Sequence, residues 1–304
     1  MIGFVFPGQG SQKRGMGRAW VDTWPELFGA ASDTSGRDLR ALVCDADDDT
    51  LRRTDNAQLA TVVCSLAAWK LASDAGLTAD ATAGHSVGEY AALTAAGVLG
   101  FADCLRLVTV RGAGMCDAAE RFGGTMLAVL GADLATVEEI CAAAGGVAVV
   151  ANVNSESEIV VSGLETDVAR VKEIARERGI RKVLPISVGG AFHSPLMAPA
   201  LAPLAEALDR AEFARPRFPV YLNVNAKAHV TDHGCAPALL AQLCSPVLWH
   251  ESIGAMHASG IDTFVVFGSG RQVAKILSRS LPDVTVVQLS EPDDLDQVLV
   301  AGRP

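Results

Sequence analysis

The hydrophobic pattern between Thr125 and Ile186 limits the fold of this chain more than any other feature. It predicts, in order, a strand (TMLAVLG), a helix (LATVEEICAAA), two strands (VAVVANV and EIVVSG), a helix (DVARVKEIARERG) and a strand (KVLPI). A β-α-β-β-α-β order is the split βαβ unit of ferredoxin-like folds. We therefore expect residues 123–187 to be a ferredoxin-like subdomain, inserted into a larger domain made of residues 1–122 and 188–304.

The regions on either side of this unit predict alternating strands and helices, the pattern of an α/β domain. Before it we expect strands at 2–6 and 79–83 and helices at 58–75, 89–97 and 101–118. After it we expect helices at 196–212, 236–244, 250–259 and 271–280, and strands at 218–224, 262–268 and 284–289.

Charge and composition exclude several classes of protein. The 304 residues include 35 acidic and 25 basic side chains, and a net charge of −10 would repel the phosphates of nucleic acids. Aromatic residues, at 5%, are too few for a surface that stacks bases. The opening MIGFVFPGQG has no basic n-region, and no apolar run approaches the roughly 18 residues of a membrane span. We expect neither a signal peptide nor a transmembrane helix.

Cysteine and histidine spacing predicts neither disulfides nor a metal site. The seven cysteines are odd in number and widely spaced, and they include no C-x-x-C pair, which is typical of reduced thiols in a cytoplasmic protein. Among the six histidines, His229 and His233 form an isolated pair without an acidic or cysteine partner. We therefore expect a cytoplasmic protein without a metal.

Gly84-His85-Ser86-Val87-Gly88 fits the G-x-S-x-G pattern, in which a serine occupies a sharp turn between a strand and a helix. The predicted strand before it and helix after it supply the required context. In such a turn the hydroxyl points into a cleft, and the amide groups at the start of the helix favour negative charge beside it. Ser86 is therefore a candidate nucleophile.

A serine nucleophile needs a base, and the histidines are the candidates. His193 lies in the loop GGAFHS, where the chain returns from the inserted unit to the larger domain. His85 is adjacent to Ser86 in sequence, but successive residues at such a turn point apart, so we expect it to pack or to form a hydrogen bond behind the turn. His250 and His257 lie on a predicted helix and are expected to be structural.

Arg111 occupies the apolar stripe of the predicted helix 101–118, with Cys104, Val108 and Met115 at helical spacing. An unpaired buried charge is very costly, so its guanidinium needs a partner. Two interpretations stay open. One is a salt bridge to a neighbouring Asp or Glu, and the other is a bidentate clamp for a substrate carboxylate, a geometry that suits Arg better than Lys.

Two glycine-rich loops do not match phosphate-binding motifs. GQGSQK near the N-terminus lacks the Gly-Lys-Ser/Thr ending, and GSGRQV has Val273 where a dinucleotide fingerprint has Gly or Ala. The first loop can still direct the backbone N–H of Gln9 at an oxyanion.

Taken together, these motifs resemble the malonyl-CoA:acyl carrier protein transacylases, including the discrete acyltransferases that load polyketide synthases in trans. The resemblance implies an α/β-hydrolase-like large domain with a ferredoxin-like insertion. The matching segments run nearly end to end and are FPGQGSQ (6–12), the Gln58 helix, GHSVGEY (84–90), RGAGM (111–115), ANVNS (151–155), SG (162–163), GAFHSPLM (190–197), FPVYLNVNA (218–226) and SPVLW (245–249).

The resemblance implies a catalytic dyad. Ser86 would be the acylated nucleophile, and His193 would act first as general base and later as acid. A backbone carbonyl at Gln242 would orient the imidazole, a role that a carboxylate has in hydrolytic triads. Arg111 would bind the free carboxylate of the malonyl group.

The resemblance also implies the surroundings of the acyl group. Backbone N–H groups of Gln9 and Val87 would form the oxyanion hole, and Gln58 and Met115 would line the pocket. Phe192 would disfavour an α-methyl group, because in the family a Phe before the histidine accompanies malonyl specificity. A single methylene is worth about 1–3 kcal/mol, so this implies a preference for malonyl over larger extender units.

The implied reaction is ping-pong transfer of a malonyl or closely related group from CoA to the phosphopantetheine thiol of an acyl carrier protein. No cofactor is implied, because the CoA thioester is a substrate and the phosphopantetheine belongs to the partner. Carrier proteins are acidic, so docking on this acidic chain needs a local basic patch. The candidates are Arg271, Lys275 and Arg279 on one predicted helix face, for which a merely solvated face is the alternative, and Arg181 with Lys182.

The chain departs from the family pattern in two places. Val266-Phe267-Gly268-Ser269-Gly270 stands where the family commonly has Glu-x-Gly-Pro-Gly, and Leu59 follows Gln58 where Pro is usual. Neither departure removes a group with an implied catalytic role, but the first puts the structural role of that loop in doubt.

Three other functions are alternatives to acyl transfer. An acyl hydrolase that clears carrier proteins would share the fold, but it gains nothing from a carboxylate clamp. A non-enzymatic carrier-binding scaffold would not need Ser86, His193 and Arg111 together. An α/β-hydrolase esterase would need an acidic triad member, and no Asp or Glu between Ser86 and His193 stands in an obvious position for it. The sequence leaves open the pathway, fatty-acid or polyketide, and the carrier, and a monomer is the default expectation.

Overall fold

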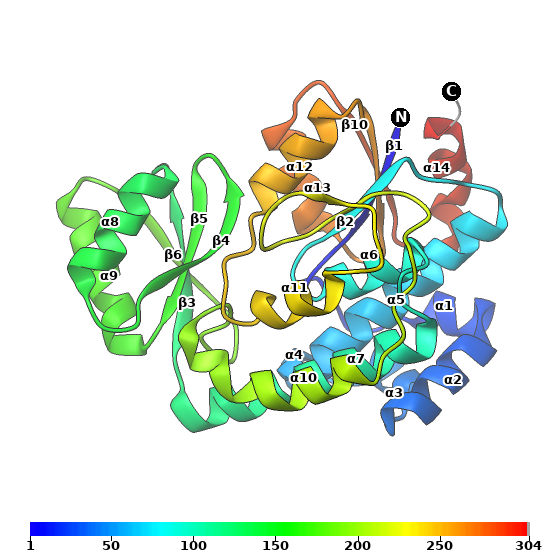
Figure 1. Cartoon of the computed structure of the whole chain (residues 1–304), viewed down its shortest axis with the longest axis horizontal. Helices are drawn as coiled ribbons and strands as arrows, with labels where there is room; N and C mark the ends of the chain where they lie inside the picture. Colours follow the sequence, from blue (N-terminus) through cyan, green and yellow to red (C-terminus); the bar gives the residue numbers. More distant parts are fainter. Residues whose placement is uncertain (303–304) are drawn as a thin grey trace.

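The computed structural model describes residues 1–302 and contains two β-sheets surrounded by helices (Figure 1). The larger sheet has the strand order β10-β9-β1-β2-β7-β8. All neighbouring strands in it are parallel except the last pair. Its strands are β1 (Ile2–Phe6), β2 (Ala81–Gly84), β7 (Val220–Tyr221), β8 (Ala228–His229), β9 (Thr263–Phe267) and β10 (Thr285–Leu289).

Helices cover the larger sheet and bury its central strand, β1. Phe4 and Phe6 of β1 pack against Phe267 of β9, with ring centroids 4.9 and 5.3 Å apart. Burial on both faces is the usual condition of parallel sheets, and it explains the continuous apolar sequence of β1. Strands β1 and β2 are adjacent and parallel, so the loops after Phe6 and after Gly84 meet at the edge of the sheet formed by the carboxyl ends of its strands. Ligands bind at this edge in open α/β folds.

Two long helices, α5 (Thr54–Asp74) and α7 (Phe101–Phe122), pack closely against each other beside this edge. Most residues of α5 are buried, which agrees with a helix that is apolar on nearly every side. The other helices of this part are α1 (Arg18–Thr23), α2 (Pro25–Ser35), α3 (Leu39–Cys44), α4 (Asp48–Arg52), α6 (Gly88–Ala95), η1 (Pro195–Ala200), α10 (Leu201–Asp209), α11 (Cys235–Gln242), α12 (Trp249–Ala258), α13 (Arg271–Ser280), η2 (Pro292–Asp294) and α14 (Leu295–Ala301).

The smaller sheet is antiparallel, with the strand order β4-β5-β3-β6, and has its own apolar core. Its elements are β3 (Thr125–Leu130), α8 (Leu134–Ala144), β4 (Val149–Ser155), β5 (Glu158–Gly163), α9 (Glu165–Glu177) and β6 (Lys182–Ile186). Helices α8 and α9 cover the outer face, while β4 contacts α12 and α13 of the larger part (Figure 1). This order confirms the predicted α/β fold with a ferredoxin-like unit. The domain limits at 123 and 187 stay a prediction.

Backbone pairing joins the smaller sheet to the segment before α12. Val247, just before α12, forms a parallel bridge with β4: its N–H donates to the carbonyl of Ala151, and its carbonyl accepts from the N–H of Val153, both at 2.9 Å. This junction lies close to the edge where the loops after β1 and β2 meet, because Asn152 and Asn154 of β4 line the same cavity as those loops.

Several predicted elements need correction. The helix predicted at 196–212 begins as the 3-10 helix η1, because Pro199 inside it lacks the N–H group that a regular helix requires, and only α10 is α-helical. The strand predicted at 218–224 is reduced to the two residues of β7, because the chain turns back at Ala226, which has a positive φ of 53°. The helices between residues 18 and 52, strand β8 and helix α14 were not predicted.

None of the helices within residues 1–302 is both long enough and apolar enough to cross a membrane.

Candidate active site

The turn between β2 and α6 is built by close approach of backbone to backbone. A Cβ atom on Gly84 would lie 2.0 Å from the carbonyl carbon of Gly88, and one on Gly88 would lie 2.3 Å from the carbonyl oxygen of Phe6. Both glycines of the motif are therefore required by space, since no side chain fits at either position. Between them Ser86 adopts a positive φ of 52°, which is strained for any residue other than glycine.

Hydrogen bonds from a neighbouring loop hold this strained residue. The Ser86 N–H donates to Oδ1 of Asn223 at 2.8 Å, and the Ser86 carbonyl accepts from Nε2 of Gln242 at 3.1 Å. Asn223 follows β7 by two residues, and the pairing of β7 with β2 brings it beside the turn. The polar groups of the Ser86 backbone are therefore satisfied from the larger sheet and from α11.

His193 reaches the Ser86 hydroxyl directly. Its Nε2 lies 2.8 Å from Ser86 Oγ, and its Nδ1 lies 2.8 Å from the carbonyl oxygen of Gln242. With Nδ1 donating to that carbonyl, Nε2 is left as an acceptor for the hydroxyl proton. Burial and the nearby charge of Arg111 lower the pKa of His193 to about 3, so the imidazole is neutral at ordinary pH.

Arg111 is buried on the α7 face that looks at Ser86. Its Nη1 donates to Oε1 of Gln58 at 2.7 Å, while Nη2 donates to Oε1 of Gln242 at 2.9 Å and to Ser86 Oγ at 3.1 Å. No carboxylate lies within 4.0 Å of this guanidinium in the described part of the chain, so the salt-bridge interpretation is wrong. Its neighbours are neutral amides and hydroxyls. Because they do not neutralise the positive charge of Arg111, this charge can attract an anion.

A cavity of about 310 Å³ opens beside these groups. The predicted residues Gln9, Gln58, Ser86, Arg111, Met115, Phe192 and His193 all line it, and Gln58 Nε2 lies 3.4 Å from Met115 Sδ. The smaller sheet adds Met126, Asn152, Asn154 and Val160, and α13 adds Gln272, Val273 and Ile276. The cavity therefore lies between the two sheets.

Two backbone N–H groups beside Ser86 are free. Those of Gln9 and Val87 have no hydrogen-bond acceptor among residues 1–302, although Val87 is fully buried. Gln9 belongs to the cavity wall, and Val87 begins the first turn of α6. This arrangement is compatible with the predicted oxyanion hole.

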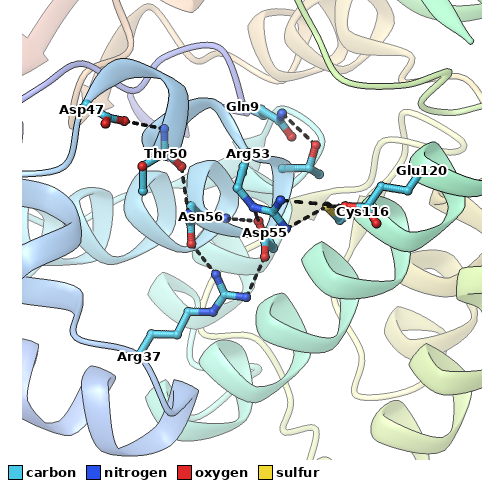
Figure 2. A network of polar contacts seen from close by, with 10 residues as sticks. Gln9, Arg37, Asp47, Thr50, Arg53, Asp55, Asn56, Cys116 and Glu120 are labelled. Atoms are coloured by element: carbon cyan, nitrogen blue, oxygen red, sulfur yellow. Dashed lines mark hydrogen bonds and ion pairs between the residues drawn. The ribbon is translucent and has the colours of Figure 1, made fainter. Parts of the chain in front are cut away.

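The side chain of Gln9 contacts the first residue of α5, beside a network of polar contacts (Figure 2). Its Nε2 donates to Oγ1 of Thr54 at 3.4 Å. The next residue, Asp55, accepts from Arg37 Nη2 at 2.7 Å and lies 3.4 Å from Arg53 Nε. Arg53 in turn approaches Cys116 and Glu120 of α7. This network ties α5, which carries Gln58, to α7, which carries Arg111.

Comparison with known proteins agrees with this geometry. A family model described as an acyl transferase domain matches residues 3–295. A malonyl CoA-acyl carrier protein transacylase of Bacillus subtilis is 36% identical over 301 residues, which cover 97% of this chain and 95% of the relative. The chain belongs to the malonyl-CoA:acyl carrier protein transacylase family. It is therefore an acyltransferase, as the sequence motifs predicted.

Solved structures of this family have the same fold. A malonyl-CoA:acyl carrier protein transacylase from Xanthomonas oryzae has a TM-score of 0.94 and 38% identity, covering 99% of this chain and 98% of its own. A malonyl-transacylase solved in complex with its type II polyketide synthase acyl carrier protein has a TM-score of 0.93 and 32% identity, covering 98% of this chain and 99% of its own. The predicted fold class is therefore confirmed.

The predicted docking residues of this acyltransferase differ in their availability. Arg271 and Lys275 are exposed on α13, the helix that also lines the cavity, and Arg181 and Lys182 are exposed beside β6. Arg279 is exposed too, but its Nη2 donates to Oε2 of Glu158 at 3.0 Å. Because that cation is already paired, the α13 patch is weaker than its sequence spacing suggested.

His85 packs and forms a hydrogen bond, as predicted, but it lines the same cavity as Ser86 and His193 instead of lying behind the turn. Its Nε2 lies 3.1 Å from Oδ1 of Asn154, and its ring packs edge-on against Trp249 at 5.4 Å. Asn154 Nδ2 donates to Glu158 Oε1 at 3.2 Å, and Glu158 is the partner of Arg279. A chain of hydrogen bonds thus runs from the turn, through the smaller sheet, to α13.

The departures from the family pattern do not disturb the site. Ser65 of α5 donates to the carbonyl of Phe267 at 3.1 Å, and Gly268 has a positive φ of 80°. A Cβ atom on Gly268 would lie 2.8 Å from the Ser65 hydroxyl. The loop keeps the glycine that this packing needs, and neither its Val266 nor its Ser269 lines the cavity.

Sequence reasoning missed Asn223 and the side chain of Gln242. Asn223 lies in FPVYLNVNA, a segment that was noted only as part of the resemblance. Gln242 was expected to act through its carbonyl alone, yet its amide also joins Arg111, Asn223 and the Ser86 carbonyl. An Asn just after an apolar run is the kind of signal that identifies a polar group at the end of a strand.

Proposed function

We propose that this acyltransferase moves a malonyl group from malonyl-CoA to the phosphopantetheine thiol of an acyl carrier protein, through an ester on Ser86. One observation carries the proposal: the Ser86 hydroxyl contacts the neutral imidazole of His193 at 2.8 Å and the unpaired cation of Arg111 at 3.1 Å, within one cavity. A nucleophile with its base beside a carboxylate-binding group is what malonyl transfer requires. The names of the relatives agree with this substrate pair.

In the first half-reaction Ser86 Oγ attacks the thioester carbonyl, and His193 Nε2 takes the hydroxyl proton. The resulting oxyanion accepts hydrogen bonds from the backbone N–H groups of Gln9 and Val87, which have no other partner in the described chain. Each such donor contributes roughly 3 kcal/mol to the stability of the transition state. The carbon–sulfur bond then breaks, and His193 returns the proton to the CoA sulfur.

In the second half-reaction the carrier thiol takes the place of CoA. His193 accepts the thiol proton as sulfur attacks the ester carbonyl of acylated Ser86. The carbon–oxygen bond breaks, and the proton passes to Ser86 Oγ, which restores the free enzyme. Ser86 and His193 therefore act in both half-reactions. A ping-pong exchange between two thioesters of similar energy requires this.

Arg111 orients the acyl group through its free carboxylate. The guanidinium has five donor positions, and its Nε has no acceptor within residues 1–302. When a malonyl carboxylate enters, Nη2 exchanges its bonds to Ser86 and Gln242 for the anion, and this frees the serine hydroxyl for attack. Phe192 forms part of the cavity wall and favours malonyl over an α-branched unit by about 1–3 kcal/mol.

We place the carrier on the side of α13. Arg271 and Lys275 are exposed there, and the neighbouring Gln272 and Ile276 line the cavity, so a partner bound to this helix stands next to the route to Ser86. Arg181 and Lys182 form the second candidate patch. The reaction needs no cofactor, and the protein acts as a monomer in the cytoplasm.

Intact-protein mass after brief incubation with malonyl-CoA, methylmalonyl-CoA or acetyl-CoA tests the proposal. We expect one malonyl adduct on the wild type, none on Ser86→Ala and a weak one on Arg111→Ala. Release of free CoA without an adduct would instead favour the hydrolase. An equal adduct from acetyl-CoA would contradict the role of Arg111.

A further inference from the structure

Glu89 is a fully buried carboxylate that the proposed mechanism does not use. It lies in the first turn of α6, three residues after Ser86, and is 0% exposed. Its Oε2 accepts a 2.6 Å hydrogen bond from the backbone N–H of Asn223, and its Oε1 has no partner in residues 1–302. Burial raises the pKa of Glu89 to about 7, despite the opposing effects of that bond, of the nearby Gln242 side chain and of the Arg111 charge.

A carboxylate in this position is not explained by the helix dipole. An acidic group in a first turn stabilises a helix while it remains exposed to water, so a dipole role does not require complete burial. Burying a carboxylate costs several kcal/mol unless bonds compensate it. The bond from Asn223 to Glu89 joins the loop after β7 to α6. The contacts of Asn223 therefore indicate the function of Glu89.

Asn223 uses both ends of its side chain on the strained turn. Oδ1 accepts from the Ser86 N–H at 2.8 Å, and Nδ2 donates to the carbonyl of Gly84 at 2.7 Å. Oδ1 also accepts from Gln242 Nε2 at 3.2 Å. The backbone N–H of Asn223 donates to Glu89. This carboxylate therefore fixes the position of the Asn223 backbone, and with it the position of the Asn223 side chain.

Gln242 extends the same network to the other reactive groups. Its Nε2 donates to the Ser86 carbonyl, its Oε1 accepts from Arg111, and its own carbonyl faces Nδ1 of His193. Glu89, Asn223 and Gln242 thus form one chain of contacts that touches the serine backbone, the arginine and the imidazole. None of the three needs to touch the substrate, and Glu89 and Asn223 do not line the cavity.

We propose that Glu89 is a positioning residue, which fixes Asn223 and through it the relative placement of Ser86 and His193. The inference rests on the proposed acyl transfer through Ser86. Its specific claim is that Glu89 acts as a hydrogen-bond acceptor for one backbone N–H. An amide oxygen at the same place should therefore serve almost as well as a carboxylate.

The test compares acylation of purified enzyme by malonyl-CoA in Glu89→Gln, Glu89→Ala and Asn223→Ala. Glu89→Ala should lower kcat of acylation on the order of 10- to 100-fold, the effect of a small misplacement of reacting groups, with KM within about threefold of the wild type. Glu89→Gln should restore kcat to within about threefold, because its Oε1 accepts the same bond. Thr94→Val, which removes a buried hydroxyl of α6 that donates to the carbonyl of Tyr90 in the same helix, is the matched control and should keep wild-type kcat.

The double variant Glu89→Ala/Asn223→Ala decides whether the two residues act as one unit. We expect its kcat to equal that of the slower single variant, because the second change removes nothing further. Circular dichroism and thermal melting establish that each variant is folded. If Glu89→Ala does not fold, Glu89→Asp, which shortens the reach to the Asn223 N–H, replaces it in the cycle.

Three results would overturn the inference: wild-type kcat in folded Glu89→Ala, an equal loss in Glu89→Gln and Glu89→Ala, or losses that multiply in the double variant. Each leaves the proposed function intact as long as the wild type forms its Ser86 adduct. A wild type that forms no adduct refutes the proposed function, and the inference falls with it.

Discussion

Nη2 of Arg111 donates a hydrogen bond to Oγ of Ser86 at 3.1 Å, so the cation contacts the hydroxyl before any substrate is present. The same Oγ lies 2.8 Å from His193. The charge of Arg111 acts on both partners. It favours the neutral form of the imidazole, and it stabilises negative charge on the serine oxygen.

Removal of the guanidinium should weaken the preference for malonyl over acetyl groups. In Arg111→Ala, kcat/KM for malonyl-CoA should fall about 10- to 100-fold, the equivalent of losing one or two charged hydrogen bonds, while acetyl-CoA is little affected. The measurement is the initial rate of CoA release with each thioester. Arg106→Ala, an exposed arginine on the same helix, is the control and should retain the wild-type ratio. A parallel loss for both thioesters would contradict carboxylate binding.

The pH profile should reflect the low pKa of His193, about 3. An imidazole of ordinary pKa is protonated as the pH falls from 7.5 to 5.5, and acylation would then drop about tenfold. Here the base stays neutral throughout that range, so His193 should contribute no fall in kcat/KM. In Arg111→Ala, where one cause of the lowered pKa is gone, the acid limb should move to higher pH. Stopped-flow acylation between pH 5 and 8 checks both curves.

Adding one methyl group to the turn should destroy the site. Gly84→Ala places a Cβ 2.0 Å from the backbone of Gly88, so the protein should fail to fold or lose all acylation. Gly29→Ala is the matched control, because nothing lies within 4 Å of its Cβ and it is inside α2. That change should raise the free energy of unfolding by about 0.5–1 kcal/mol. Urea unfolding of both variants gives the comparison.

The network at the start of α5 should contribute stability at neutral pH. Burial alone would raise the pKa of Asp55, but the bonds and charges of Arg37 and Arg53 hold that pKa below its usual value. Asp55→Asn should lower the free energy of unfolding by about 1.5–3 kcal/mol at pH 7. A group with a lowered pKa stabilises the fold above its unfolded pKa and loses this effect as the pH falls, so the difference should shrink below about pH 4.

The control for this experiment is Asp49→Asn, whose exposed pair with Arg52 should contribute almost nothing. Chemical unfolding at pH 7 and at pH 3.5 measures the difference for each variant. A constant difference at the two pH values would assign the effect of Asp55 to packing instead of charge.

Charge reversal on α13 should separate the two half-reactions. Arg271→Glu/Lys275→Glu should lower kcat/KM for transfer to the carrier about tenfold at low salt, while self-acylation by malonyl-CoA is unchanged. Arg170→Glu/Arg176→Glu on α9, on the outer face of the smaller sheet, is the control and should affect neither step. An equal fall in both steps would refute docking on α13, and an unchanged transfer rate would direct attention to Arg181 and Lys182.

Local sequence patterns predicted the fold well where a helix or strand has a strong hydrophobic period and clear residues at its two ends. The turn at Ser86 and helices such as α13 are determined by residues that are close together in the sequence. A short stretch of sequence is therefore enough to predict them. The helices between residues 18 and 52 are less predictable, because all but α2 have only one or two turns and they are held by packing against one another and against α5 and α7.

The site was predictable in part. Ser86 and Arg111 stand out because a serine between glycines and a charge in an apolar stripe each break a local rule. Asn223 and Glu89 do not, because each forms its contact across the topology, where β7 lies beside β2. No spacing within the chain reveals that pairing. The roles proposed for Val87 and Phe192 came from family resemblance, whereas His193 and Gln9 were candidates from their own loops before the resemblance was considered.

The cavity lies between two sheets, so separate stretches of the sequence form its walls. Ser86, Arg111 and His193 belong to the larger part, whereas Met126 and Val160, which also line the cavity, belong to the smaller sheet. Part of the cavity wall is thus encoded apart from the bond-making groups, although Phe192 and Met115 belong to the larger part. Exchanging residues 125–163 between members of the family offers a way to change the accepted acyl chain while the reacting groups remain untouched.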